Sequence, residues 1–264
     1  YADMLDAKIQ SEGPDSVLAF IVEPIGGAST GALVPPRGYM ERIREICDRY
    51  GILLIMDEVM TGAGRTGKFL GSDHWSAQPD IVVMSKGLGA GYMPLGAVIA
   101  NEQLVAPVLN AGGFAHGFTY AGNPLACAAG LAVVNEIEMQ GLCDNATLMG
   151  DTLLARLSDL MQKYELIGDV RGKGLLTAFE FMADRDSKAP LPAHLNAHQR
   201  FVDLAYARGL IVYSRRTREG TEGDHILVCP PLIANAEHID EIMDGLDASM
   251  AKFCQDIHAD LKAG

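Results

Sequence analysis

Three short apolar segments of the chain each end in ionisable side chains. Residues 17–22 are followed by Glu23, residues 52–56 by Asp57 and Glu58, and residues 81–84 by Ser85 and Lys86. If the segments are neighbouring strands, these side chains meet, because ligands of open α/β sheets gather at the carboxyl ends of the strands. We therefore expect acids and a lysine to converge on one site.

The chemistry of such a site follows from the residue types. Burial of Lys86 beside a strand end would favour its neutral amine, which can attack a carbonyl carbon and form a Schiff base. An aspartate on a neighbouring strand, such as Asp57, is what a pyridinium nitrogen requires. Taken singly, Lys86 could be a surface lysine and Asp57 a helix cap. Together, and with glycines at positions 87, 89 and 91, they indicate a site.

The segments that must position these residues read as alternating strands and helices. The three apolar runs lack polar alternation, which is typical of strands buried on both faces of a parallel sheet. Between the first two, Ile43, Ile46, Cys47 and Tyr50 have helical spacing, and Gly51 can end that helix. Strand, helix, strand of this kind predicts a βαβ unit.

The second half of the chain has a different pattern. A helix is expected after Pro124, in two pieces around Gly141, and strands over 175–181, 210–213 and 226–228. A loop is expected over 184–192 and a closing amphipathic helix over 236–253. The predicted fold class is α/β, with a mainly parallel sheet in residues 1–144 and a smaller α+β domain in residues 145–264.

Composition limits the classes of function. The 264 residues are 48% hydrophobic, and the formal net charge of −13 argues against binding the phosphate backbone of nucleic acid. The five cysteines contain no CxxC pair, so neither a disulfide framework nor a zinc site is expected. With no apolar run long enough to span a bilayer and no visible signal peptide, we expect a cytoplasmic protein.

Several ordered motifs resemble the class III (omega-type) aminotransferases. They are Asp-Glu-Val-Met-Thr-Gly-Ala-Gly-Arg-Thr-Gly at 57–67, Gln-Pro-Asp-Ile at 78–81, Ser-Lys-Gly-Leu-Gly-Ala-Gly-Tyr-Met-Pro-Leu-Gly at 85–96, His-Gly-Phe-Thr-Tyr-Ala-Gly-Asn-Pro at 116–124, Val-Arg-Gly-Lys-Gly at 170–174 and Pro-Pro-Leu at 230–232. The resemblance covers nearly the whole chain. It implies fold type I, with a three-layer large domain and a small C-terminal domain, and pyridoxal 5′-phosphate as cofactor. It also implies a homodimer that moves an amino group from a small donor to a keto acid.

The resemblance also implies roles for individual residues. Lys86 would hold the cofactor as a Schiff base and move the proton of the substrate carbon as general base and acid. Asp57 would pair with the pyridinium nitrogen, and Val59 would pack against the ring. Thr119 would donate to the cofactor phosphate, reaching across from the partner subunit.

The chain departs from the family pattern in two ways. A Gly-Ser phosphate turn and a ring-stacking aromatic residue normally lie upstream, and neither is identifiable, so we expect the chain to belong to a longer protein. Members that use 2-oxoglutarate often carry a glutamate and an arginine at the positions of Ala28 and Leu227. Their absence favours the branch that moves amino groups from amines or omega-amino acids to pyruvate.

The same branch can bind a substrate carboxylate with a flexible arginine of the small domain. Arg215 is the candidate, with Arg216 and Arg218 close behind, since guanidinium groups bind carboxylates through a planar fork. A solvated basic loop is an equally open interpretation of the three arginines.

Other functions remain as alternatives. A decarboxylating transaminase or an aminomutase would use the same cofactor, and a non-catalytic aminotransferase-like binding protein would not be an enzyme. Residues 62–67 match the G-x-G-x-x-G dinucleotide fingerprint, which would indicate a nicotinamide-dependent oxidoreductase, but that motif should open a helix. His194 and His198 are four residues apart without a third ligand, so we expect a solvated helix face and no metal.

Overall fold

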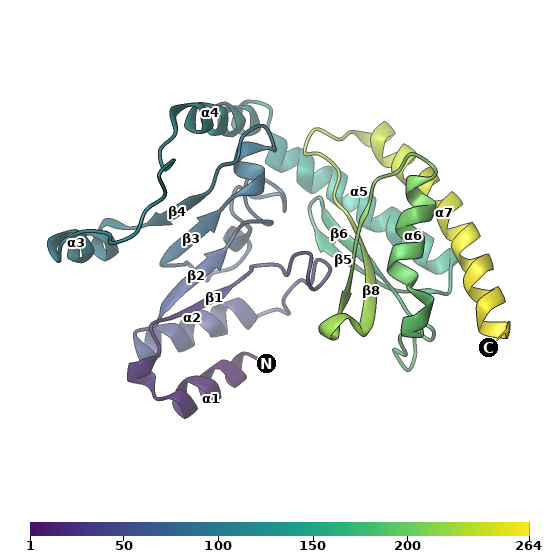
Figure 1. Ribbon diagram of the computed structural model, residues 1–264, viewed down its shortest axis with the longest axis horizontal. Helices are drawn as coiled ribbons and strands as arrows, with labels where there is room; N and C mark the ends of the chain where they lie inside the picture. Colours follow the sequence, from purple (N-terminus) through teal and green to yellow (C-terminus); the bar gives the residue numbers. More distant parts are fainter. Residues whose placement is uncertain (264) are drawn as a thin grey trace. The chain divides into compact units, whose positions relative to one another are not determined.

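The computed structural model describes residues 1–263, and its contacts divide the chain into two compact units. The first unit comprises residues 1–24 and 35–143, and the second comprises residues 25–34 and 144–264. Figure 1 shows each unit built around its own sheet. The α/β fold class predicted from the sequence is confirmed.

The first unit contains a four-stranded sheet in the order β1-β2-β3-β4. Its elements are α1 (Ala2–Glu12), β1 (Ala19–Val22), α2 (Tyr39–Tyr50), β2 (Leu53–Asp57), β3 (Ile81–Met84), β4 (Ala97–Ala100), α3 (Glu102–Asn110) and α4 (Pro124–Met139). The first three strands are parallel, and β4 runs antiparallel to β3. The sheet is therefore mainly parallel, as expected from three unbroken apolar runs.

The two N-terminal helices pack on one face of this sheet, where Figure 1 shows α1 and α2 together. The buried face of α2 includes Met40, Ile43 and Ile46, which cluster with Leu54 and Met56 of β2. Gly51 ends α2 in the left-handed conformation, with φ of 64°. Such a C-terminal glycine turns the chain directly into β2, and so fixes where the strand starts.

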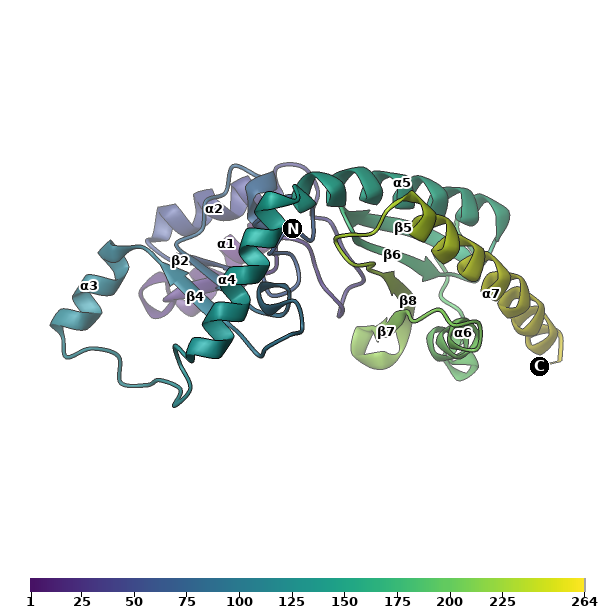
Figure 2. The ribbon, with the colours of Figure 1, turned by 90° about the horizontal axis from the view of Figure 1, so that it is seen from above.

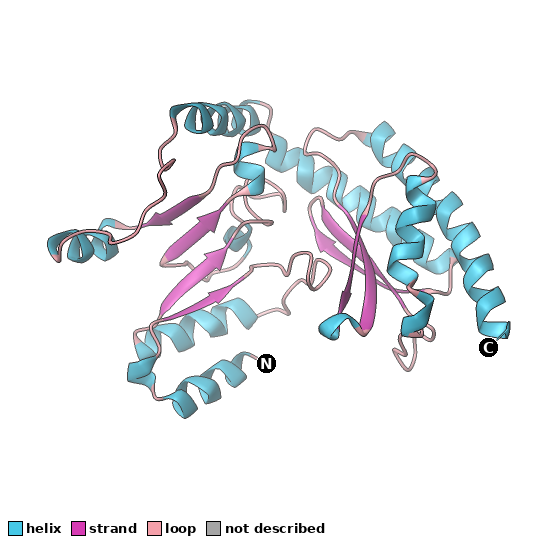
Figure 3. Ribbon diagram, in the orientation of Figure 1, coloured by secondary structure: helices cyan, strands magenta, loops and turns pink. Residues whose placement is uncertain are grey.

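The second unit is an antiparallel sheet with helices packed on it, and Figures 2 and 3 show its strands and helices. Its strands lie in the order β5-β6-β8-β7. Its elements are α5 (Leu142–Lys163), β5 (Ile167–Lys173), β6 (Leu176–Phe181), α6 (Ala197–Tyr206), β7 (Tyr213–Thr217), β8 (Glu222–Val228) and α7 (Ala236–Ala263).

The core of the second unit lies between its sheet and its helices. Phe179 and Phe181 of β6 project from the same face of the strand and contact Phe201 of α6. Phe253 of α7 stacks on Phe181 with ring centroids 4.5 Å apart. Aromatic pairs of this kind add to the stabilisation that burial provides.

Residues 25–34 form a strap that belongs to the second unit although the chain enters it directly from β1. The Arg171 guanidinium donates to the carbonyl oxygens of Gly31, at 2.7 Å, and Thr30, at 3.0 Å. His225 Nε2 lies 3.0 Å from the carbonyl oxygen of Ala28. Gly31 has φ of 67°, and a Cβ atom there would lie 2.6 Å from the His225 ring, so only glycine fits.

The sequence pattern misplaced one strand and missed others. The strand expected over 210–213 begins instead at Tyr213 and continues through the charged residues Arg215 and Arg216 to Thr217. Because β7 is an edge strand, its polar side chains can face solvent, and an apolar run is not needed to form it. Strands β4 and β5 had not been predicted.

No helix in the described part of the chain has the length and apolar character needed to cross a membrane.

Candidate active site

The carboxyl ends of β2 and β3 form the centre of the candidate site. The two strands are parallel neighbours, with Asp57 opposite Val83, and the N–H of Glu58 donates to the carbonyl oxygen of Val83 at 2.8 Å. Asp57 is the last residue of β2, and Lys86 follows two residues after the end of β3. Neighbouring strands lie about 4.8 Å apart. The structure therefore brings Asp57 and Lys86 to adjacent strand ends, as the sequence predicted.

Asp57 is half-buried and directs one carboxylate oxygen to the backbone. Its Oδ1 accepts a hydrogen bond from the N–H of Val59 at 3.0 Å. Its Oδ2 has no hydrogen-bond partner among the described residues. One oxygen thus fixes the side chain, and the other can receive an N–H from a ligand.

Lys86 begins a short 3-10 turn, Lys86–Gly89, and its backbone is strained. Its φ of 39° lies in the left-handed region, which costs a residue with a side chain roughly 1–3 kcal/mol. Such strain collects at functional sites, where the surrounding structure holds it. The Ser85 hydroxyl donates to the carbonyl oxygen of Leu95 at 3.0 Å and closes the turn at its base.

Lys86 is exposed in the described chain. Its strand end lies at the rim of the sheet, and Gly87 and Gly91 beside it carry no side chains that could cover it.

Glu58 is a buried carboxylate next to Asp57 whose contacts were not anticipated from the sequence. Its side chain is 1% exposed and accepts hydrogen bonds from the backbone N–H groups of Gly71, at 2.8 Å, and Ser72, at 2.7 Å. It also accepts from the Thr61 hydroxyl. A glutamate followed three residues later by a threonine is a local signal for such a contact, whereas the pairing with residues 71–72 is not visible in the sequence.

Val59 and Thr119 occupy different settings within the first unit. Val59 is half-buried and lies two residues after the end of β2. Thr119 is exposed in the segment 111–123 between α3 and α4, near the exposed side chains of Phe118 and Tyr120. No hydrogen bond between described residues joins Thr119 to Asp57 or Lys86. The chain alone therefore does not complete the predicted cofactor site.

The three candidate arginines of the second unit differ in their contacts. Arg216 is largely buried, with 10% of its side chain exposed, and donates to the Asp224 carboxylate at 2.9 Å, whereas Arg218 pairs with Glu222. Arg215 is exposed on β7, and its Nε donates to the hydroxyl of Tyr213 at 2.8 Å. Among the described residues Arg215 has no carboxylate partner, so it is the arginine of the three that is available to an anion.

His198 was expected on a solvated helix face, and that expectation is wrong. Its side chain is largely buried and pairs with the carboxylate of Asp224, which also pairs with the Arg216 guanidinium.

Residues 62–67 form turns and open no helix, so the interpretation of the G-x-G-x-x-G pattern as a dinucleotide-binding motif is not supported.

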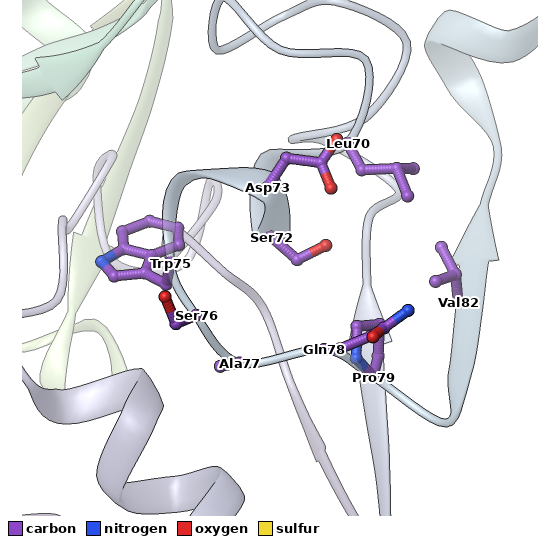
Figure 4. A pocket seen from close by; sticks show the side chains of 9 residues that line it. All are labelled: Leu70, Ser72, Asp73, Trp75, Ser76, Ala77, Gln78, Pro79 and Val82. Atoms are coloured by element: carbon purple, nitrogen blue, oxygen red, sulfur yellow. The ribbon is translucent and has the colours of Figure 1, made fainter.

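A cavity of about 570 Å³ lies in the first unit. Figure 4 shows its lining. The lining consists of Leu70, Ser72, Asp73, Trp75, Ser76, Ala77, Gln78, Pro79 and Val82. Neither Asp57 nor Lys86 contributes to it, and Asp73 is the one ionisable residue of its lining. The strand ends are therefore the better candidate.

Comparisons with known proteins show the family of the chain. Residues 3–250 match the family described as Aminotransferase class-III. A taurine–pyruvate aminotransferase of Bilophila wadsworthia is 43% identical over 253 residues, which cover 93% of this chain and 54% of that protein. A hypotaurine/taurine–pyruvate aminotransferase of Paracoccus denitrificans is 38% identical over 95% of this chain and 55% of its own length.

Solved structures show the same relationship. A transaminase from the marine bacterium Virgibacillus superposes with a TM-score of 0.91 at 36% identity, over 97% of this chain and 57% of that one. An amine transaminase from an uncultivated Pseudomonas species, solved in a PLP-bound form, has a TM-score of 0.87 at 39% identity, over 96% of this chain and 56% of that one. The chain thus spans little more than half the length of the relatives it matches.

Proposed function

Because the chain belongs to the class III aminotransferase family, whose members depend on pyridoxal phosphate, we propose that it carries the lysine and aspartate of an aminotransferase site. The observation that supports this most directly is the placement of Asp57 and Lys86 at the carboxyl ends of two neighbouring parallel strands. An acid and an amine at adjacent strand ends can hold opposite ends of one heteroaromatic ring.

The residues present fit the cofactor. Asp57 keeps Oδ2 without a partner in the described structure, as a ring N–H requires, and its Oδ1 is held by the N–H of Val59. Lys86 presents an exposed amine on a turn of glycines. When bound, pyridoxal phosphate supplies a ring that can accept an electron pair from the substrate carbon.

Three residues of the chain have proposed roles in holding the cofactor and moving the proton. Lys86 would hold the cofactor through its amine and would move the proton at the substrate carbon, as base and as acid. Asp57 would accept the N–H of the ring nitrogen. Val59, two residues beyond Asp57, would line the ring face.

Thr119 is proposed to donate its hydroxyl to the cofactor phosphate of a partner subunit in a symmetric homodimer. Its exposure supports this, as does that of Phe118 and Tyr120 beside it, which are 80% and 81% exposed. Large aromatic side chains at this level of exposure are typical of surfaces that are covered in an assembly.

The proposed substrates are an amine or omega-amino acid as donor and pyruvate as acceptor. The names of the taurine–pyruvate relatives support pyruvate, and so does Leu227, which is buried and cannot pair with a dicarboxylate. Arg215 is the proposed partner of a substrate carboxylate or other anionic group, since its guanidinium has no carboxylate partner in the described structure.

A donor screen tests this proposal. The purified protein is incubated with pyridoxal phosphate, pyruvate and a panel of amines, omega-amino acids and an omega-amino sulfonate, and alanine formation is followed. Alanine is expected with pyruvate and not glutamate with 2-oxoglutarate. Release of carbon dioxide from the donor would instead identify a decarboxylating transaminase, and rearrangement without alanine an aminomutase.

A further inference from the structure

Glu58 is a buried acid to which the proposed reaction assigns no step. Burying a carboxylate is costly unless hydrogen bonds replace its hydration. The carboxylate of Glu58 receives three: from the N–H groups of Gly71 and Ser72 and from the hydroxyl of Thr61. Hydrogen bonds to an ionised acceptor are about twice as strong as neutral ones. The group therefore ties the turn after β2 firmly to residues 71–72.

The backbone of Glu58 is held as well. Its N–H donates to the carbonyl oxygen of Val83 on β3, at 2.8 Å, and its carbonyl oxygen accepts from the N–H of Gly62, at 2.9 Å. Glu58 thus lies between Asp57 and Val59 in sequence and is fixed at backbone and side chain together. The hydrogen bond from Val59 to Asp57 Oδ1 spans this residue.

The packing around Glu58 leaves little room for the turn to shift. A Cβ atom on Gly71 would lie 2.7 Å from Cβ of Thr61 and 3.0 Å from Oε2 of Glu58. A Cβ atom on Gly62 would lie 2.8 Å from the carbonyl oxygen of Glu58. Real Cβ atoms do not approach other atoms so closely, so both glycines are required by the close fit.

We infer that Glu58 is a positioning residue for Asp57: its buried carboxylate holds the turn in the conformation that orients Asp57 by the Val59 hydrogen bond and leaves Oδ2 for a ligand. The importance of this for catalysis rests on the proposed role of Asp57. The effect of Glu58 on the conformation of the turn does not depend on that role, and it can be measured without cofactor.

The experiment uses Glu58→Gln, which keeps the size of the side chain and replaces one acceptor oxygen by a donor NH2. That NH2 must face an N–H or O–H donor, so at least one of the three hydrogen bonds is lost. The matched control is Glu41→Gln, since Glu41 accepts from the N–H of Ser76 at 3.2 Å and so contacts the same loop from α2, away from Asp57.

Amide hydrogen exchange at Val59 is the readout, measured on protein without added pyridoxal phosphate. Glu58→Gln is expected to accelerate it at least about tenfold, the value of one lost hydrogen bond, and Glu41→Gln to leave it within about twofold of wild type. Unchanged exchange at Val59 with faster exchange at Gly71 and Ser72 would mean that Glu58 anchors the loop only, and would overturn the inference. Equal acceleration in both variants would overturn it too.

Thr61→Val provides a second variant if Glu58→Gln does not fold, because it removes only the hydroxyl donor. It is expected to accelerate exchange at Val59 by a smaller factor, about threefold, and no acceleration would contradict the inference. Titration with pyridoxal phosphate follows: Glu58→Gln should bind at least about tenfold more weakly than Glu41→Gln. A wild-type protein without cofactor affinity would count against the proposed function while leaving the exchange result intact.

Discussion

Two regions of the molecule differ in how far their side chains are exposed to solvent. One is the carboxyl ends of the strands in the first unit, and the other is the face of the second sheet that the helices cover. Lys86 and Thr119 are exposed, and Asp57 is half-buried with one oxygen lacking a partner in the described structure. By contrast, Phe179, Phe181, Phe201 and Phe253 are at most 1% exposed and contact one another. The side chains of the first region are exposed or partly exposed, and those of the second form a closed core. Substitutions in the first region should therefore change the rate of transamination, and substitutions in the second should change the free energy of unfolding.

The largest effect on rate is expected from Lys86→Ala. Loss of the amine removes both the attachment of the cofactor and the acid–base group, so transfer to pyruvate should be abolished. Because Lys86 is exposed, the free energy of unfolding should change by no more than about 0.5 kcal/mol. Lys8→Ala, on the exposed face of α1, is the control for rate. Wild-type turnover by Lys86→Ala would show that the first region does not carry the reaction.

Asp57→Asn should lower kcat/KM by about 10²–10⁴-fold, a range typical of losing a group that controls a reacting proton. The amide can still accept from the N–H of Val59, so the geometry is kept while the negative charge is lost. Asp73→Asn, an exposed aspartate of the same unit, is the control. Steady-state kinetics with saturating cofactor measure the effect, and a loss below about threefold would speak against the role of the charge.

Phe181→Ala should act in the opposite way, on stability. Removing a ring packed against Phe253 and Phe201 should lower the free energy of unfolding by about 3–5 kcal/mol. Tyr206→Ala, at a 70% exposed ring on α6 of the same unit, should change the free energy of unfolding little. Urea unfolding of both variants makes the comparison. A loss below about 1 kcal/mol for Phe181→Ala would show that the cluster does not hold the second unit.

The smallest effect concerns the thiol of Cys254, which lies beside the phenylalanine cluster. Burial raises its pKa to about 11, and Glu165 adds to the rise. A raised thiol pKa disfavours the reactive thiolate, so at pH 8 Cys254 should react with iodoacetamide about 10²-fold more slowly than an ordinary thiol. Peptide mapping by mass spectrometry, with exposed Cys127 as the internal reference, measures this. Equal rates of reaction at Cys254 and Cys127 would indicate that solvent and reagent reach the core of the second unit.

The three parallel strands of the first sheet and the position of Asp57 and Lys86 at their ends could be predicted, because both depend on local sequence. Unbroken apolar runs mark the strands β1, β2 and β3, and a parallel sheet brings their carboxyl ends to one edge. Asp57 and Lys86 are therefore found by reading the residue that follows each run. Gly51 likewise marks the end of α2 through its left-handed conformation.

Other features depend on contacts between distant residues and are hidden from such reading. The strap 25–34 is held by Arg171 and His225, which follow it by more than a hundred residues. The contacts of Glu58 with Gly71 and Ser72 likewise join separate parts of a loop. Strand β7 is charged and lies at an edge, so its pairing with β8 rather than its apolar content defines it.

The position of the covalent attachment tests the central claim most directly. Protein incubated with pyridoxal phosphate is reduced with borohydride, digested and mapped by mass spectrometry, with Lys86→Ala treated in parallel. The expected result is a phosphopyridoxyl group on the peptide that contains Lys86, and none on that peptide in the variant. Attachment at another lysine, or equal labelling of both proteins, would contradict the assignment of Lys86.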